Sequence, residues 1–175
     1  MQETKLPLLI GIGSRIRKSP YFDSTIKYGV TGFTIYNRMY LPTAFSGPES
    51  EYNSLINDVT FGDFAAERQV EVSGPDAYNF IRYINPRNLS KCDIGDCKYI
   101  VLTDKNGGII NDACLIRLEP NKFWVSPGDG DVLLWLQGIA INSGMDVDIH
   151  EPDVSPLQIS GPKAGKLIQK LFNGI

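Results

Sequence analysis

The tripeptide Asn106-Gly107-Gly108, which lies between two apolar segments, is the feature that most restricts how this chain can fold. Tight hairpin turns need residues with positive φ, so the tripeptide predicts two antiparallel strands at residues 99–103 and 109–118. Alternate residues of a strand share a face. The more apolar face of the second strand carries Ile110, Asp112, Cys114, Ile116 and Leu118. Asp112 is the one charged residue there, and hydrogen bonds or a bound cation would have to compensate for any hydration it loses.

The first strand of this hairpin supplies a neighbour for Asp112. If the connecting loop has an even number of residues, Tyr99, Val101 and Thr103 share the face of Asp112. A phenol and a carboxylate would then project together from one face of the sheet, as in a binding site. An aspartate near a strand end that only binds backbone N–H groups is the alternative, and the pattern leaves both open.

A repeated unit is the second guide to the fold. Residues 70–77 (VEVSGPDA) and 157–164 (LQISGPKA) share a strand, a Ser-Gly-Pro sequence and the start of an apolar helix, because proline is favoured in a first helical turn. Strands and helices that alternate in this way predict a mixed α/β or α+β domain, and we expect the α+β class, with mixed sheets and packed helices. The other expected elements are strands at 28–40, 67–72, 123–126 and 145–149, a turn around Leu41-Pro42, and helices at 51–57, 76–84, 131–142 and 167–172.

Composition and charge narrow the class of protein. Apolar residues make up 42% of the chain and charged residues 21%, which is usual for a globular domain with a real core. A net charge of −3 offers no basic surface for nucleic acid. No apolar segment is long enough to span a membrane, and residues 6–12 are too short for a secretory signal. We therefore expect a cytoplasmic protein that binds neither nucleic acid nor membranes.

The cysteines and the histidine argue against a metal site. Cys92 and Cys97 have a spacing that is weak evidence for zinc without further ligands, and the odd number of cysteines favours free thiols. His150 is the only histidine, which argues against a histidine triad or a multi-histidine metal site.

Several segments together resemble the folate-dependent aminomethyltransferase family, which comprises the T-protein of glycine cleavage and its relatives. They are VSGPDA at 72–77, Tyr99, GGIIND at 107–112, and QISGPKA at 158–164. The dimethylsulfoniopropionate demethylase branch is more similar still. Its likeness extends to SRIRKSP at 14–20, YNRM at 36–39, ERQVE at 67–71, GDGD at 128–131 and EPDVSP at 151–156. Asn111-Asp112 also resembles this branch, whereas T-proteins usually have Asp-Asp.

The resemblance implies a fold and a domain organisation. It implies a folate-binding, aminomethyltransferase-like fold of which this chain is the N-terminal half, because family members are much longer. Residues 1–57 would form the first part of domain 1, and 58–150 an α/β domain with the central hairpin. Residues 151–175 would return to domain 1. The missing C-terminal half, or association with a second copy, is expected to cover the incomplete domain.

The resemblance also implies roles for individual residues. Asp112 matches the active-site aspartate of the family. Tyr99 and Ser126, together with Asp112, match contacts of tetrahydrofolate. Tyr36 and Met39 fall in the segment that lines the substrate side, where Tyr40 is a further aromatic candidate. No metal is implied.

The implied activity is transfer of a methyl group from a small methylated substrate to tetrahydrofolate. In the demethylase branch the substrate is dimethylsulfoniopropionate, and the products are methylmercaptopropionate and 5-methyltetrahydrofolate. A carboxylate can stabilise the positive charge that develops on N5 and help to remove its proton. The same site would serve a glycine-cleavage aminomethyltransferase or an aryl-ether O-demethylase. A non-catalytic folate-binding or interaction module is the alternative outside the enzymes.

Overall fold

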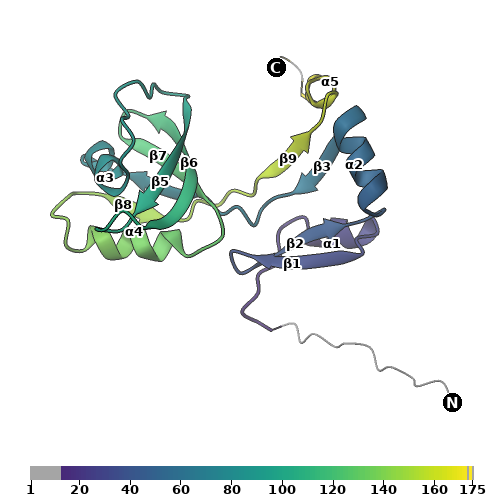
Figure 1. Ribbon diagram of the computed structural model, residues 1–175, viewed down its shortest axis with the longest axis horizontal. Coiled ribbons are helices and arrows are strands. Elements are labelled where there is room, and N and C mark those ends of the chain that lie inside the picture. The colour runs from purple at the N-terminus through teal and green to yellow at the C-terminus, as the bar shows by residue number, and fades with distance from the viewer. Residues whose placement is uncertain (1–12, 173, 175) are drawn as a thin grey trace.

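The computed structural model describes residues 13–172 and 174, which form two lobes joined by two linkers (Figure 1). We call them the sheet lobe (residues 70–150) and the hairpin lobe (the described residues before 64 and after 156). Residues 6–12, considered above as a possible secretory signal, lie outside the described residues. Within the described part, no helix is long and apolar enough to cross a membrane.

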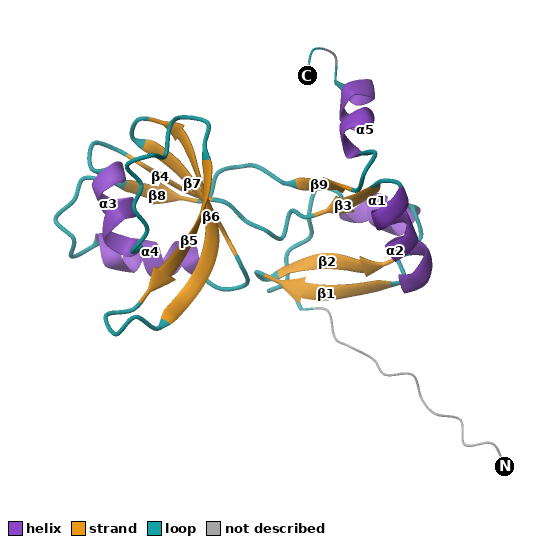
Figure 2. Cartoon of the chain, turned by 45° about the horizontal axis from the view of Figure 1, so that its top comes forward, coloured by secondary structure: helices purple, strands orange, loops and turns teal. Residues whose placement is uncertain are grey.

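The sheet lobe is built on five antiparallel strands in the order β5-β6-β7-β4-β8. The strands are β4 (Val70–Ser73), β5 (Cys97–Thr103), β6 (Ile109–Glu119), β7 (Lys122–Pro127) and β8 (Asp148–His150). Helices α3 (Ala77–Ile84) and α4 (Val132–Ala140) cover one face of this sheet (Figure 2). Phe80, Phe123 and Leu136 are fully buried between helices and sheet. Each such side chain contributes about 1.5–3 kcal/mol by leaving water, so this lobe has a core of its own.

The hairpin lobe contains two separate two-stranded sheets and three helices. Its elements are α1 (Phe22–Lys27), β1 (Gly32–Tyr36), β2 (Met39–Ala44), α2 (Pro48–Asn57), β3 (Thr60–Asp63), β9 (Leu157–Ser160) and α5 (Ala164–Leu171). Strand β1 pairs with β2, and β3 pairs with β9. Neither α2 nor α5 has a buried residue, and Phe61 and Phe172 are more than half exposed. This lobe therefore leaves apolar surface uncovered.

The pairing of β3 with β9 returns the C-terminal segment of the chain to the lobe that the N-terminal segment forms. The mixture of sheets and packed helices confirms the α+β class. Residues 60–63 lie with the hairpin lobe, and the sheet lobe begins at Val70, later than the expected domain boundary at residue 58. The rest of the expected division into two domains stays a prediction.

Three of the expected elements differ from those in the structure. The first hairpin turns at Asn37 and Arg38, with φ of 46° and 59°, and not around Leu41-Pro42. Asparagine tolerates this left-handed conformation. Pro42 lies inside β2 instead, which is permitted because a two-stranded sheet leaves its N–H side free. The strand expected at 67–72 begins only at Val70, and the strand expected at 145–149 is limited to residues 148–150.

The two Ser-Gly-Pro units fold alike, as their repetition predicts. Gly74 and Gly161 have φ of 118° and 120°, and the residue before each helix has φ of −100°. A Cβ on Gly74 would lie 2.8 Å from the carbonyl oxygen of Asp146. Glycine is required at this position both by its φ and by the neighbouring backbone.

The carboxylate of Glu151 connects the linkers through hydrogen bonds to two arginines. Its Oε1 accepts a hydrogen bond from Nη2 of Arg17 at 2.9 Å, and its Oε2 accepts one from Nε of Arg68 at 2.9 Å. Glu151 precedes β9, Arg68 precedes β4, and Arg17 precedes α1. A single carboxylate thus joins three segments that are far apart in the sequence.

Candidate functional site

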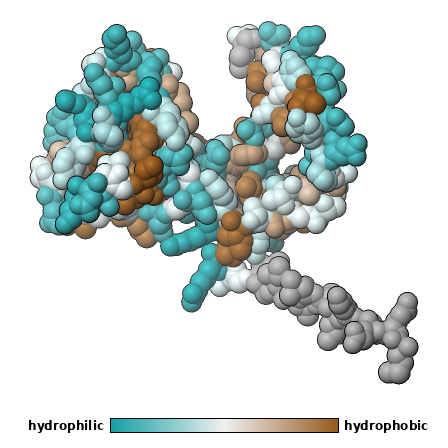
Figure 3. Space-filling view, in the orientation of Figure 1, coloured by the Kyte–Doolittle hydropathy of each residue, from teal (hydrophilic) through white to brown (hydrophobic). Residues whose placement is uncertain are grey.

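The face of the five-stranded sheet that α3 and α4 leave uncovered carries the candidate site, and we call it the open face. Val101 pairs with Asp112, Tyr99 pairs with Cys114, and Cys114 pairs with Ser126, so these residues share one face. Its members include Tyr99, Val101, Asp112, Cys114, Ile116, Trp124 and Ser126. A hydrophobic strip lies over β5 and β6 in Figure 3, beside an open notch between the lobes.

The helices do not pack on the face of β6 that has more apolar residues. Ala113 and Leu115, which are 3% and 0% exposed, point to the helices, and Asp112 remains exposed to solvent. Asp112 therefore keeps its hydration, although its face of β6 carries more apolar residues than the other. The reason is that all strands of a sheet must bury the same face of the sheet. Strands β4 and β7 place the buried Val72 and Val125 on the helix side, so β6 buries that side as well.

Tyr99 and Asp112 form a hydrogen bond on the open face. The Tyr99 hydroxyl donates to Oδ2 of Asp112 at 2.7 Å. The pKa of Tyr99 is raised, first because Asp112 holds the phenol proton and then by burial. The prediction that these two side chains lie together is confirmed. Residues 104–108 form an odd-numbered loop, and a β-bulge between Leu102 and Thr103 restores the register that unites them.

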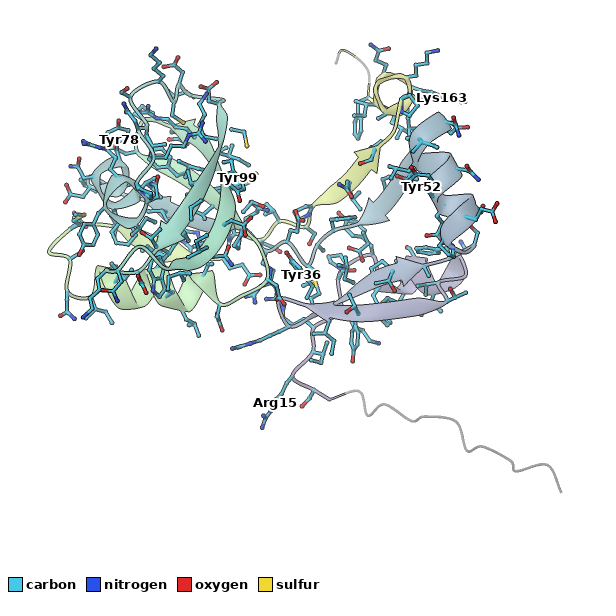
Figure 4. All side chains as sticks on the ribbon, in the orientation of Figure 1. Arg15, Tyr36, Tyr52, Tyr78, Tyr99 and Lys163 are labelled. Carbon is cyan, nitrogen blue, oxygen red and sulfur yellow. The ribbon has the colours of Figure 1, made fainter. Side chains whose placement is uncertain are left out.

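Tyr36 reaches the same place from the hairpin lobe. A Cβ on Gly128 would lie 3.3 Å from Oδ1 of Asp112 and 3.7 Å from the Tyr36 hydroxyl, so both groups border this glycine. Burial and then the negative charge of Glu67 raise the pKa of Tyr36. In Figure 4, Tyr99 projects from the sheet lobe toward the notch, and Tyr36 lies at the base of the notch. Two phenols and a carboxylate therefore converge from three separate segments.

Asn111 fixes the turn that separates Asp112 from Tyr36. Its Nδ2 donates to the carbonyl oxygen of Asp129 at 3.1 Å, and its Oδ1 accepts the N–H of Gly128 at 3.0 Å. An aspartate at this position could not donate the first of these bonds. The asparagine that distinguishes this chain from the usual Asp-Asp pattern thus has a structural role beside Asp112.

Asn37 holds the other side of the same turn. Its backbone N–H donates to Oδ1 of Asp129 at 2.8 Å, and its Oδ1 accepts the N–H of Gly130 at 2.8 Å. These bonds dock the first hairpin on the sheet lobe and place Tyr36, the preceding residue. The sequence gives no periodic signal for this contact, because it joins residues that are about 90 positions apart.

The remaining candidates are placed in different surroundings. Ser126 lies on the open face and accepts a hydrogen bond from Nε2 of Gln69 at 2.9 Å. Met39 is 3% exposed and packs in a small core, and Tyr40 is 8% exposed with its ring against Phe22. Of the candidates for the substrate side, the structure brings Tyr36 to Asp112 and buries Met39 and Tyr40 in the hairpin lobe.

The titratable and thiol groups of the described residues include no cluster of three or more that could hold a metal ion. Cys92 is buried, Cys97 and Cys114 are exposed, and all three are free. Nδ1 of His150 lies 2.7 Å from Oδ2 of Asp148, away from Asp112 on the far edge strand β8.

The chain is similar in sequence to several proteins of known class. The family profile described as "GCVT N-terminal domain" matches residues 21–175. The dimethylsulfoniopropionate demethylase DmdA of Ruegeria pomeroyi is 40% identical over 158 residues, which are 90% of this chain and 43% of that protein. An aminomethyltransferase of Corynebacterium aurimucosum is 31% identical over 87% of this chain and 42% of its own length. The chain therefore spans less than half the length of these relatives.

A solved structure shares the fold. The crystal structure of glycine cleavage system aminomethyltransferase T from Bartonella henselae superimposes with a TM-score of 0.81 at 21% identity. The match covers 91% of this chain and 45% of that one. The two lobes described above thus correspond to an arrangement known from experiment.

Proposed function

Because the chain belongs to the family described as the GCVT N-terminal domain, we propose that it is part of a tetrahydrofolate-dependent methyltransferase. We propose dimethylsulfoniopropionate as the methyl donor, with methylmercaptopropionate and 5-methyltetrahydrofolate as products. The 40% identity to a dimethylsulfoniopropionate demethylase supports this donor. Since the chain spans 43% of that relative, the proposed activity is that of the longer protein. We expect it to act in the cytoplasm.

The observation that carries the proposal is the Tyr99–Asp112 hydrogen bond on a sheet face that no helix covers. Tyr99 occupies Oδ2 of Asp112, so Oδ1 is available to a ligand on the side of Gly128 and Tyr36. Carboxylate, phenol and hydroxyl groups on one flat face fit the polar edge of a planar heterocycle such as a pterin. Bound tetrahydrofolate would supply N5 as the methyl acceptor.

Asp112 has two tasks in the proposed reaction. Its carboxylate stabilises the positive charge that methyl transfer places on the acceptor nitrogen. It then helps to remove the proton of that nitrogen, either directly or through water. Tyr99 restricts the carboxylate to one orientation through its hydrogen bond, and Gly128 fixes the backbone of Asp112 by donating its N–H to the carbonyl oxygen at 3.0 Å. This preorganisation is the contribution of the sheet lobe.

Tyr36 is the residue that we assign to the substrate side. A sulfonium cation is attracted by the face of an aromatic ring, and its methyl group is already activated for transfer. The enzyme then has to hold donor and acceptor in line and at contact distance. Tyr36 borders Gly128, as Oδ1 of Asp112 does, so a cation on its ring would lie beside the acceptor site.

Replacing Asp112 by asparagine tests its role. We expect Asp112→Asn, in the chain completed to the length of its relatives, to lower methyl transfer by about a hundredfold to a thousandfold. Binding of tetrahydrofolate should change little, because asparagine keeps the size of the side chain and can still accept the bond from Tyr99. The measurement is single-turnover formation of 5-methyltetrahydrofolate beside a tetrahydrofolate titration. Turnover within a few-fold of the unchanged protein would remove Asp112 from the mechanism.

A second candidate donor follows from the aminomethyltransferase relatives, of which one is 31% identical. The same carboxylate would serve the transfer of an aminomethylene carbon to tetrahydrofolate. The completed protein should be assayed with dimethylsulfoniopropionate, with aminomethyl-lipoyl protein and with an aryl methyl ether. Product from the lipoyl substrate alone would assign the chain to glycine cleavage instead, and binding of folate without any product would make it a binding module.

A further inference from the structure

Gln69 lies at the end of a row of side chains that crosses the open face. The row runs from Tyr99 on β5 through Cys114 on β6 to Ser126 on β7, because these residues are paired in register. Val70 pairs with Val125, so Gln69, directly before β4, comes next to Ser126. Gln69 is only 6% exposed, and its Nε2 lies 2.9 Å from Ser126 Oγ.

A backbone carbonyl fixes the orientation of the Gln69 amide. Nε2 of Gln69 also lies 2.9 Å from the carbonyl oxygen of Glu67. A carbonyl oxygen can only accept, so the group beside it must be the NH2 and not the oxygen of the amide. The alternative amide orientation would place two oxygen atoms in contact at this distance. The Oε1 atom is buried and has no hydrogen-bond partner among the described residues, so the orientation rests on the contacts of Nε2.

The amide orientation determines where the proton of Ser126 is directed. The NH2 group of Gln69 donates one hydrogen to Glu67 and the other to Ser126 Oγ. Ser126 therefore accepts from Gln69, and within the described residues its own hydroxyl proton has no acceptor. The opposite holds at the other end of the row, where Tyr99 gives its proton to Asp112 and its oxygen is left to accept.

We propose that Gln69 is a positioning residue that makes Ser126 a hydrogen-bond donor to the ligand of the open face. The open face then presents acceptors at Tyr99 and at Asp112, which lies beside the row, and a donor at Ser126. It selects a planar ligand whose edge carries N–H groups at one end and an acceptor atom at the other. This assignment rests on the proposed function: the ligand is tetrahydrofolate, and the acceptor is a carbonyl oxygen or an unprotonated nitrogen of its pterin ring.

Gln69→Glu reverses the proposed polarity with almost no change of shape. A carboxylate at this position accepts from Ser126, so the hydroxyl proton turns away from the ligand. We expect Gln69→Glu to weaken tetrahydrofolate binding to this chain about three- to tenfold, the value of one hydrogen bond. Gln137→Glu is the matched control, because Gln137 lies on α4 and, within the described part of the chain, its side chain hydrogen-bonds only the carbonyl oxygen of Ile149, at 2.9 Å. It should leave the affinity unchanged.

A double-mutant cycle separates positioning from a general loss of structure. If Gln69 acts through Ser126, the effect of Gln69→Glu disappears in a Ser126→Ala background. An equal loss of affinity in both backgrounds would overturn the proposal and make Gln69 merely a structural residue.

A ligand-free measurement keeps the test decisive if Gln69→Glu unfolds the protein. In NMR spectra of this chain, Ser126→Ala should shift one of the two side-chain amide protons of Gln69 and leave the other in place. If neither proton moves, the proposed orientation is wrong. If the unchanged chain does not bind tetrahydrofolate, the proposed ligand fails, and the amide resonances still decide the orientation of Ser126.

Discussion

At the scale of single residues, the properties of the site arise from pairs and not from individual side chains. Asp112 is exposed, and its orientation comes from the Tyr99 hydroxyl and from a backbone bond to Gly128. Ser126 obtains its direction from Gln69 in the same way. Each of these contacts joins neighbouring strands or residues directly next to them, so a substitution at one residue changes the chemistry of its partner.

Tyr36 should distinguish the two ligands of the proposed reaction. We expect Tyr36→Leu in the completed protein to weaken binding of the sulfonium substrate by about 0.5–2 kcal/mol, because the cation loses an aromatic face. Binding of tetrahydrofolate should weaken less. Calorimetric titration with each ligand separately measures both effects. Equal weakening of the two, or none, would indicate that Tyr36 serves packing only, and a lower free energy of unfolding would then accompany the substitution.

At the scale of elements, the strand–Ser-Gly-Pro–helix unit is used twice in different surroundings. In the sheet lobe it links the interior strand β4 to the buried helix α3, and in the hairpin lobe it links β9 to α5, which has no buried residue. The glycine conformation is the same in both units. The local sequence therefore determines the turn, while the packing of the helix depends on what lies against it.

Gly74→Ala should be clearly destabilising, in contrast to the same substitution in a helix. With φ of 118° and a backbone oxygen 2.8 Å from the added Cβ, we expect a loss of about 1–3 kcal/mol in the free energy of unfolding. Gly138→Ala in α4 has open space and should gain about 0.4–1 kcal/mol. Urea denaturation of both variants makes the comparison. Equal effects of the two substitutions would contradict the argument from φ.

At the scale of the whole molecule, hydrogen bonds and ion pairs hold the lobes together, and several of them have a charged partner. Glu151 joins Arg17 and Arg68 across the linkers, and Asn37 joins the first hairpin to the turn at residues 128–130. The relative position of Tyr36 and Asp112 depends on these bonds. A change that loosens the linkers would therefore act on the site without touching it.

The Glu151 contacts should make the stability of the chain depend on acid pH. Burial by itself would raise the pKa of Glu151, but hydrogen bonds and charges from Arg68 and Arg17 lower it from 4.5 to about 2. Because the pKa is lower in the folded state, the stabilisation is complete above about pH 5 and is lost as the pH falls toward 2. The shift corresponds to about 3 kcal/mol at most, which partial exposure and screening reduce to about 1–2 kcal/mol.

Glu151→Gln tests this assignment. The variant should be less stable than the unchanged chain at neutral pH, and the difference should shrink between about pH 5 and pH 2. Glu119→Gln is the control, since Glu119 is exposed and forms no ion pair among the described residues. Thermal unfolding at low ionic strength across this range provides the data. Parallel stability curves for the unchanged chain and Glu151→Gln would show that the ion pairs contribute nothing.

The 175-residue chain by itself should be a poor enzyme that associates with other molecules. The open face and the hairpin lobe expose apolar side chains, among them Ile109, Phe61 and Phe172, and such surface favours association. We expect light scattering to detect dimers or larger species, and activity to require the segment that the relatives have beyond this chain. A monomer with normal turnover would contradict this prediction.

The sequence by itself determined the local features of this protein. The Asn-Gly-Gly hairpin, the two Ser-Gly-Pro turns and the helix at 76–84 follow from turn chemistry and periodicity, which act within a few residues. The contact between Tyr99 and Asp112 could be predicted for the same reason, because both lie on one hairpin. The resemblance to a family then added candidate roles that the pattern alone left open.

The tertiary structure decided which face of β6 is buried and which residues from distant segments join Asp112. The core face was set by α3, α4 and the neighbouring strands together, so it could not be read from the apolar residues of one strand. The roles of Asn37 and Gln69 could not be predicted from local sequence, since they depend on hydrogen bonds to residues 57 or more positions away. Met39 and Tyr40, which were candidates for the substrate side together with Tyr36, are instead buried and packed within the hairpin lobe. Such contacts depend on how separate elements pack in three dimensions, and patterns within a few residues of sequence do not determine that packing.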